Sequence, residues 1–266
     1  MKISNRWKII LLATIFNLSF EYSMRGIGGF FKPIFFPFIL FGFYFTLFSM
    51  LEDLIVRFKL RNYQLVLAAF LYGIFPMAFA TGVLFNKPQF LGINWGALFY
   101  IGFLWWGIIQ AIFTFYFANR LVRRGWNCPK MGKLGWFSAI TYNVVVLAWM
   151  KLVNPHLVLI QPIAYLIFIL IAFTTVFFLW QDLKKNKQRQ FWQFEQSKVM
   201  DFLSFGTFIL FVFLGTYFAG GQVGDLRAGG SHVNLTAVKI VHLWTIISVI
   251  TFFVYRFLIR KKEITI

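Results

Sequence analysis

Long stretches without a charged residue constrain this chain more than any other feature of its sequence. Cutting it at every Asp, Glu, Lys and Arg leaves uncharged stretches of 19 residues or more at 33–51, 62–86, 88–119, 152–181 and 202–224. A helix needs about 20 mostly apolar residues to cross about 30 Å of hydrocarbon. Each stretch therefore predicts one membrane-spanning helix. The composition agrees, since a chain with 60% hydrophobic and 13% charged residues cannot cover a soluble surface.

Three shorter uncharged stretches become long enough only when neighbouring charged residues are included. The first takes in Glu21 and Arg25, the last takes in Lys239, and the middle one is bounded by Lys133 and Lys151, whose long side chains reach the membrane surface. The sequence thus predicts an all-α polytopic membrane protein, a single membrane domain over 1–266 without a soluble domain. Its eight expected transmembrane helices cover 9–29, 33–54, 63–85, 91–119, 134–152, 157–182, 202–220 and 233–255.

The basic residues alternate between the two sides of this arrangement. In chain order the loops hold 3, 2, 3, 1, 5, 1, 5, 2 and 4 Lys or Arg, which is 20 on one side and 6 on the other. Short loops rich in Lys and Arg stay in the cytoplasm. We therefore expect both termini to be cytoplasmic, in the cytoplasmic (inner) membrane. The net charge of +18 then predicts contact with anionic membrane lipids rather than with nucleic acid.

A short pattern recurs between the two halves of the chain. The motif T-x-F-x4-D-L at 46–54 recurs at 175–183, and a Pro-Ile pair recurs at the same offset of 129. We interpret 1–130 and 131–266 as tandem four-helix repeats, related by an axis along the membrane normal. The alternative is chance, because Phe, Leu and Ile are so abundant here.

Four ionisable residues fall inside the first and last predicted spans. Counted at about 1.5 Å per residue from the cytoplasmic boundary, Glu21 and His242 lie about 20 Å up and Arg25 and Lys239 about 25 Å up. Ionisable groups at such depth are costly and often mark function. If the first and last helices meet, these four residues form a substrate-binding or coupling site. In the alternative, Glu21 pairs with Arg25 along its own helix and Lys239 reaches the outer headgroups.

The loop at 220–232 is the other unusual element. It contains five glycines together with Asp225, Arg227 and His232. Exposed backbone N–H groups and an arginine favour phosphate or carboxylate, so the loop is a candidate lid or anion-binding nest. The alternative is a flexible extracytoplasmic linker.

Three amides lie near the predicted midplane, at Asn17, Gln110 and Asn143. Amides inside membranes usually bond between helices as packing elements. We expect that role here, with a polar path as the alternative.

Few cysteines and histidines are available for metal or haem chemistry. Cys128 is the single cysteine, and the three histidines do not form a facing pair on different spans. We predict no metal and no cofactor.

The leading hypothesis is a carrier or transporter that binds or moves an amphipathic or anionic small molecule through a cleft facing the outer leaflet. One alternative is an intramembrane enzyme that acts on a lipid or lipid-linked substrate at the extracytoplasmic face. Another is a non-catalytic subunit that packs against other membrane chains or against copies of itself. The sequence leaves open whether the protein is an enzyme.

Overall fold

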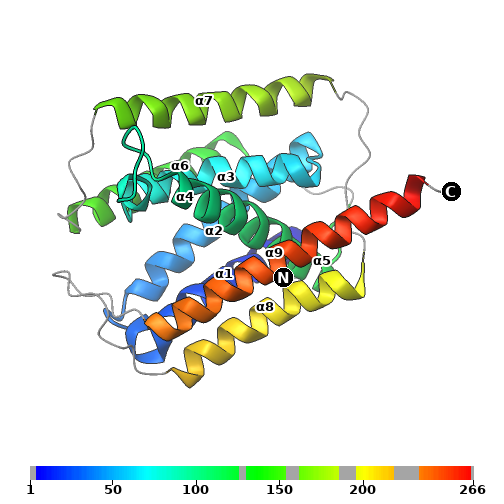
Figure 1. The fold of residues 1–266 in the computed structure, drawn as a ribbon, viewed down its shortest axis with the longest axis horizontal. Coiled ribbons are helices and arrows are strands. Elements are labelled where there is room, and N and C mark those ends of the chain that lie inside the picture. The colour runs from blue at the N-terminus through cyan, green and yellow to red at the C-terminus, as the bar shows by residue number, and fades with distance from the viewer. Residues whose placement is uncertain (1–3, 126–129, 154–161, 186–195, 219–233, 265–266) are drawn as a thin grey trace. The chain divides into compact units, whose positions relative to one another are not determined.

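The computed structural model describes residues 4–125, 130–153, 162–185, 196–218 and 234–264 (Figure 1). Within these residues the chain is helical and contains no strand. Its elements are α1 (Asn5–Phe30), α2 (Phe36–Phe58), α3 (Asn62–Phe79), η1 (Val83–Phe85), α4 (Trp95–Ala97), the π-helical η2 (Leu98–Phe113), α5 (Thr114–Leu121), α6 (Lys133–Val153), α7 (Pro162–Lys185), α8 (Lys198–Tyr217) and α9 (Leu235–Ile264).

Six helices among the described residues are long and apolar enough to cross a membrane. They are α2, α3, the continuous stretch Trp95–Leu121, α7, α8 and the Leu235–Ile259 part of α9. The chain is therefore a multi-pass helical membrane protein. The two other predicted spans are helical as well, α1 with 26 residues and α6 with 21. That α1 and α6 also cross the membrane remains a prediction.

Two helix ends differ most from the predicted spans: α9 runs to Ile264 instead of residue 255, and α3 ends early. The uncharged stretch predicts a helix to residue 85, yet α3 ends at Phe79, one turn after Pro76. The N–H groups of Ala80 and Thr81 both donate to the carbonyl of Pro76, and Gly82 follows with φ of 66°. That left-handed conformation favours glycine and stops the helix. A separate turn, η1, completes the predicted span.

The helices pack in two units, each with its own contacts. The first comprises Met1–Tyr44, Phe113–Arg123 and Phe194–Ile266, and the second comprises Phe45–Ile112 and Arg124–Gln193. The chain passes from one unit to the other four times: within α2, where η2 meets α5, after Arg123 and after Gln193. The repeat halves 1–130 and 131–266 are not tested by this division and stay a proposal.

In the first unit, α1, α8 and α9 lie side by side (Figure 1). The ring of Phe16 on α1 fills the centre and contacts three other phenylalanine rings at centroid distances of 5.5 to 6.2 Å. Helices α1 and α8 run parallel, while α5 and α9 run antiparallel to both. The contacts that establish these directions are Phe16–Phe208, Tyr22–Thr216, Asn17–Thr114, Asn5–Arg123, Met24–Asn234 and Thr207–Trp244.

The second unit is arranged around α3. Helix α6 runs parallel to α3, and η2 and α7 run antiparallel to it; α2 is antiparallel to α6. The contacts that establish these directions are Tyr72–Asn143, Lys151–Phe79, Gln64–Asp182, Phe79–Phe168, Val66–Gly107, Met77–Gly102, Thr46–Asn143 and Asp53–Trp136.

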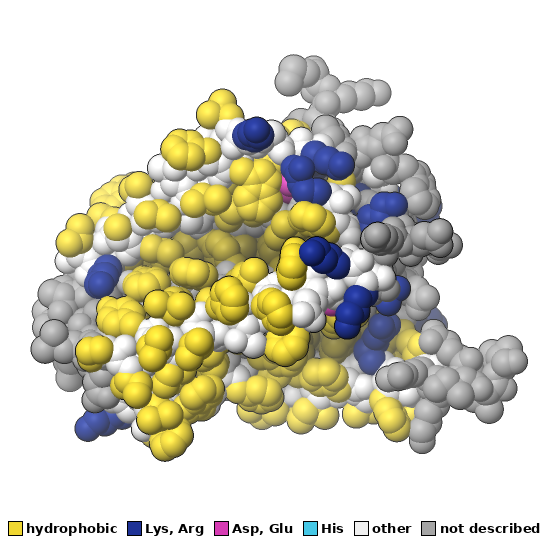
Figure 2. Space-filling view, turned by 90° about the horizontal axis from the view of Figure 1, so that it is seen from above, with side chains coloured by type: hydrophobic (Ala, Val, Ile, Leu, Met, Phe, Trp, Pro, Cys, Tyr) yellow, Lys and Arg dark blue, Asp and Glu magenta, His cyan; other side chains and the backbone are white. Residues whose placement is uncertain are grey.

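Hydrophobic side chains are spread across the face drawn in Figure 2, while Lys and Arg gather mainly toward one side of it. The exposure of the hydrophobic side chains differs between helices, because α2 buries 67% of its most apolar window and α7 only 17%. Aliphatic and aromatic side chains left exposed along a whole helix are the surface that lipid tails solvate. The exposed faces thus fit a bilayer rather than water.

Candidate functional site

The Glu21–Arg25 pair lies in the last three turns of α1. Arg25 Nε is 3.2 Å from Glu21 Oε2, and the two side chains are 17% and 18% exposed, respectively. Their spacing of four residues places both on one helix face, as the sequence predicts. The structure thus forms the pairing within α1 that the sequence offers as one of two alternatives.

Two aromatic residues of α2 complete the surroundings of this pair. The hydroxyl of Tyr44 donates to Glu21 Oε1 at 3.3 Å, and the Arg25 guanidinium lies 4.5 Å from the ring centroid of Phe36. A phenol donor and a ring face both lower the cost of holding charges away from water. Sequence reasoning missed both residues, since nothing distinguishes them from the other aromatics of this chain.

A kink follows the pair directly. Gly26, four residues before the end of α1, has φ of 64° and ψ of 168°, values outside the helical region. A residue with a Cβ is strained in that conformation, so glycine is required here. Irregular backbone at membrane depth is tolerated where it is buried in protein or lines a cavity. The ion pair therefore lies next to a kink that the sequence encodes through Gly26.

The start of α9 lies beside this end of α1. The N–H of Asn234 donates to the carbonyl of Met24 at 2.8 Å, and the Asn234 side chain accepts from the Ala237 N–H at 3.0 Å, which caps α9. Asn234 is buried. The first and last helices thus meet, as the four-residue hypothesis requires.

The position of Lys239 and His242 follows from this anchor. At about 1.5 Å per residue, Lys239 lies about 7.5 Å along α9 and Glu21 about 4.5 Å back along α1, so the two are nearly level. By the same count His242 lies about 12 Å along α9, more than a turn deeper than Glu21. Both α9 side chains are exposed. In the structure Glu21 contacts Arg25 and Tyr44, and the start of α9 contacts α1 near them. Lys239 and His242 are exposed on the surface of α9.

The glycine-rich loop predicted as a lid lies outside the described residues. Asp225, Arg227 and His232 all belong to it. Their role stays a proposal.

The other acidic residues with described contacts are anchors at helix ends. Arg124 makes two hydrogen bonds of 2.6 Å to Glu52, and both side chains are fully buried. Asp201 accepts from Tyr116 at 2.7 Å and from Arg120 at 3.0 Å, and Asp182 accepts from Tyr63 at 2.6 Å. Glu21 differs from these because it lies two turns inside a helix end, beside a kink.

Metal ligands do not gather in the described part of the chain, where no group of three His, Cys, Asp or Glu side chains lies close enough to hold an ion.

No match to the chain was found among protein-family models, curated proteins or solved structures.

Proposed function

We propose that this protein is an eight-span carrier of the cytoplasmic membrane, with both termini in the cytoplasm. It binds or moves an amphipathic or anionic small molecule through a cleft facing the outer leaflet. The observation that carries this proposal is the ion pair of Glu21 and Arg25, held at the Gly26 kink by Tyr44 and adjoined by the start of α9.

The directions of the helices support eight spans. In such a chain, odd-numbered spans run one way through the membrane and even-numbered spans the other. In the first unit the first and seventh helices, α1 and α8, are parallel, and the fourth and eighth run against them. In the second unit the third and fifth, α3 and α6, are parallel, and the second, fourth and sixth are antiparallel to their neighbours. Counting α1 and α6 as spans agrees with every one of these pairs.

The arrangement of charges supports a site with two states. Without substrate, Arg25 is neutralised by Glu21. An anionic substrate competes with Glu21 for Arg25. The released Glu21 carboxylate then pairs with Lys239, which lies at nearly the same level on α9. Such an exchange costs less than displacing Glu21 alone, because the Glu21 carboxylate and the Arg25 guanidinium each keep an oppositely charged partner at both stages. Asp225, Arg227 and His232 of the loop before α9 then cover the bound anion, and His242 lines its path.

The first test is to identify what the protein carries. The intact chain is extracted gently from its own membrane, and the species released on denaturation are identified by mass spectrometry. We expect a stoichiometric anion or anionic lipid. In Arg25→Gln its occupancy should fall at least about tenfold, since a charge-assisted hydrogen bond contributes about 1.5 to 3 kcal/mol. Lys32→Gln removes an equal charge beyond the same helix end and serves as the matched control.

The second test separates a carrier from the alternatives. In proteoliposomes loaded with the identified species, Glu21→Gln should abolish exchange while leaving expression and binding intact. Chemical conversion of that species would instead indicate an enzyme. Partner chains at fixed stoichiometry without a ligand would indicate a subunit. Full exchange by Glu21→Gln would contradict the proposed site.

A further inference from the structure

A second polar centre, independent of the Glu21 site, forms where α2 ends. Its carboxylate is Asp53, which accepts from the backbone N–H of Met131 at 2.6 Å and from the indole of Trp136 at 2.8 Å. Arg57 also contacts this carboxylate: its Nε lies 3.0 Å and its Nη2 2.9 Å from Asp53 Oδ2. The Asp53 side chain is fully buried. The carboxylate is therefore saturated with donors and fixes the segment before α6 against the end of α2.

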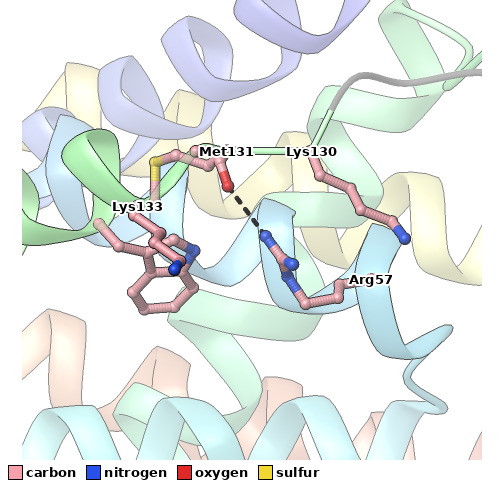
Figure 3. Close-up of a pocket in the computed structure, with 6 residues that line it drawn as sticks. Arg57, Lys130, Met131 and Lys133 are labelled. Carbon is pink, nitrogen blue, oxygen red and sulfur yellow. Dashed lines mark hydrogen bonds between the residues drawn. The ribbon is translucent and has the colours of Figure 1, made fainter.

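These anchors build an open cavity of about 550 Å³. Ligand sites commonly have such volumes. Three of the six lining residues are cationic, and none is acidic; they are Arg57, Lys130, Met131, Gly132, Lys133 and Trp136. Figure 3 shows Arg57 between Lys130 and Lys133, with its guanidinium turned to the Met131 carbonyl.

The charge of this cavity is only partly compensated. Asp53 neutralises one of the three cations, through Arg57, and no ion pair among the described residues includes Lys130 or Lys133. Arg57 uses Nε and Nη2 for Asp53 and Met131, so its Nη1 remains available within the described structure. The lining thus keeps about two positive charges and at least one planar donor for an anion.

The start of α6 adds to this preference. The helix begins at Lys133, on the cavity wall, runs for 21 residues and has no acidic residue in its first turn. Its positive dipole end therefore acts together with the lysines. Trp136 adds an apolar ring, suited to the part of a ligand that follows its charged group.

We propose that this cavity binds a phosphate-bearing anion, with Lys130 and Lys133 as its principal ligands and Arg57 Nη1 as a third. The anion is either the headgroup of a membrane lipid or a soluble phosphate ester. Arg57, Lys130 and Lys133 all belong to the strongly basic side of the predicted arrangement, so under the proposed topology the site faces the cytoplasmic leaflet.

The test measures binding to the purified full-length protein in a non-ionic detergent. The probes are dihexanoyl phosphatidic acid for the lipid source, glycerol 3-phosphate for the soluble source, and inorganic phosphate. Two lysines near a phosphate contribute about 1 kcal/mol each, so Lys130→Gln/Lys133→Gln should weaken binding about 30-fold. Lys184→Gln/Lys185→Gln removes the same charge at the exposed end of α7, from two residues that do not line the cavity, and should change binding less than about twofold.

The outcomes distinguish the two sources. Binding of the lipid alone assigns the headgroup, and equal binding of glycerol 3-phosphate assigns a soluble ester; either supports the site. Lys130→Arg/Lys133→Arg should restore affinity, which a purely structural effect of the glutamines would not predict. The proposal is overturned if no probe binds, or if both glutamine pairs weaken binding equally.

Discussion

Gln110 is a buried amide with no hydrogen-bond partner among the described residues. Gln110 is 2% exposed, and neither its side-chain nitrogen nor its side-chain oxygen makes a hydrogen bond within the described residues. The two other midplane amides do bond between helices: Asn17 donates to Thr114 at 3.2 Å, and Asn143 donates to Thr46 at 2.8 Å. The packing role predicted for the three amides is therefore confirmed for two of them. The sequence does not predict that the Gln110 amide lacks a hydrogen-bond partner, because this depends on which side chains of other helices face it.

Replacing Gln110 should stabilise the protein. Gln110→Met keeps the length of the side chain and removes a buried polar group whose desolvation costs about 1 to 3 kcal/mol, so the melting temperature in detergent should rise. Asn143→Leu is the control, since it removes bonded groups near the same depth and should lower that temperature. A fall with Gln110→Met would show that the amide has a partner after all.

At the scale of the helix, a close approach of α1 and α8 in the first unit depends on Gly215. A Cβ at this position of α8 would fall on the ring of Tyr22, whose hydroxyl also pairs with Thr216 at 3.2 Å. Small residues let membrane helices approach closely and pack, which is the main source of their association. The contact lies one residue along α1 from Glu21, so packing of α8 also holds the proposed site in place.

Gly215→Ala should therefore destabilise the protein by about 1 to 3 kcal/mol, the usual cost of overpacking. Gly206→Ala is a matched control on the same helix. A Cβ there meets Trp244 at 3.6 Å, an ordinary contact, and alanine is the better helix former by up to about 1 kcal/mol. The pair is compared by thermal unfolding in detergent. Equal effects of the two substitutions would contradict the close α1–α8 packing.

At the scale of the whole molecule, the proposed topology assigns every loop to one side of the membrane. Lys87 lies in a loop with a single basic residue and Lys185 at the end of α7, beside a strongly basic loop; both are exposed. In a Cys128→Ser background, a membrane-impermeant maleimide added to intact cells should label Lys87→Cys. Lys185→Cys should be labelled only after permeabilisation. Labelling of both, or of Lys185→Cys alone, would require a different number of spans or the opposite orientation.

Helix positions were largely predictable from the sequence, because a bilayer imposes a length and excludes charge locally. All eight predicted spans overlap helices of the structure. The largest differences are that α3 ends six residues early, before Gly82 takes a left-handed conformation, and that α9 continues nine residues past its predicted end. Helices α1, α6 and α9 needed charged residues to reach full length, and of these only α9 is long and apolar enough to be shown as a candidate span.

The sequence by itself determined that this is a helical membrane protein, how its helices are spaced along the chain, and that Glu21 and Arg25 share one face. Only the tertiary structure decided which groups meet. It brought Tyr44 to Glu21 and Asn234 to Met24, and it gathered cations of α2 and the start of α6 around one cavity. The physical reason is that charge and hydropathy act within a helix, whereas partner choice depends on the shapes of helices far apart in sequence.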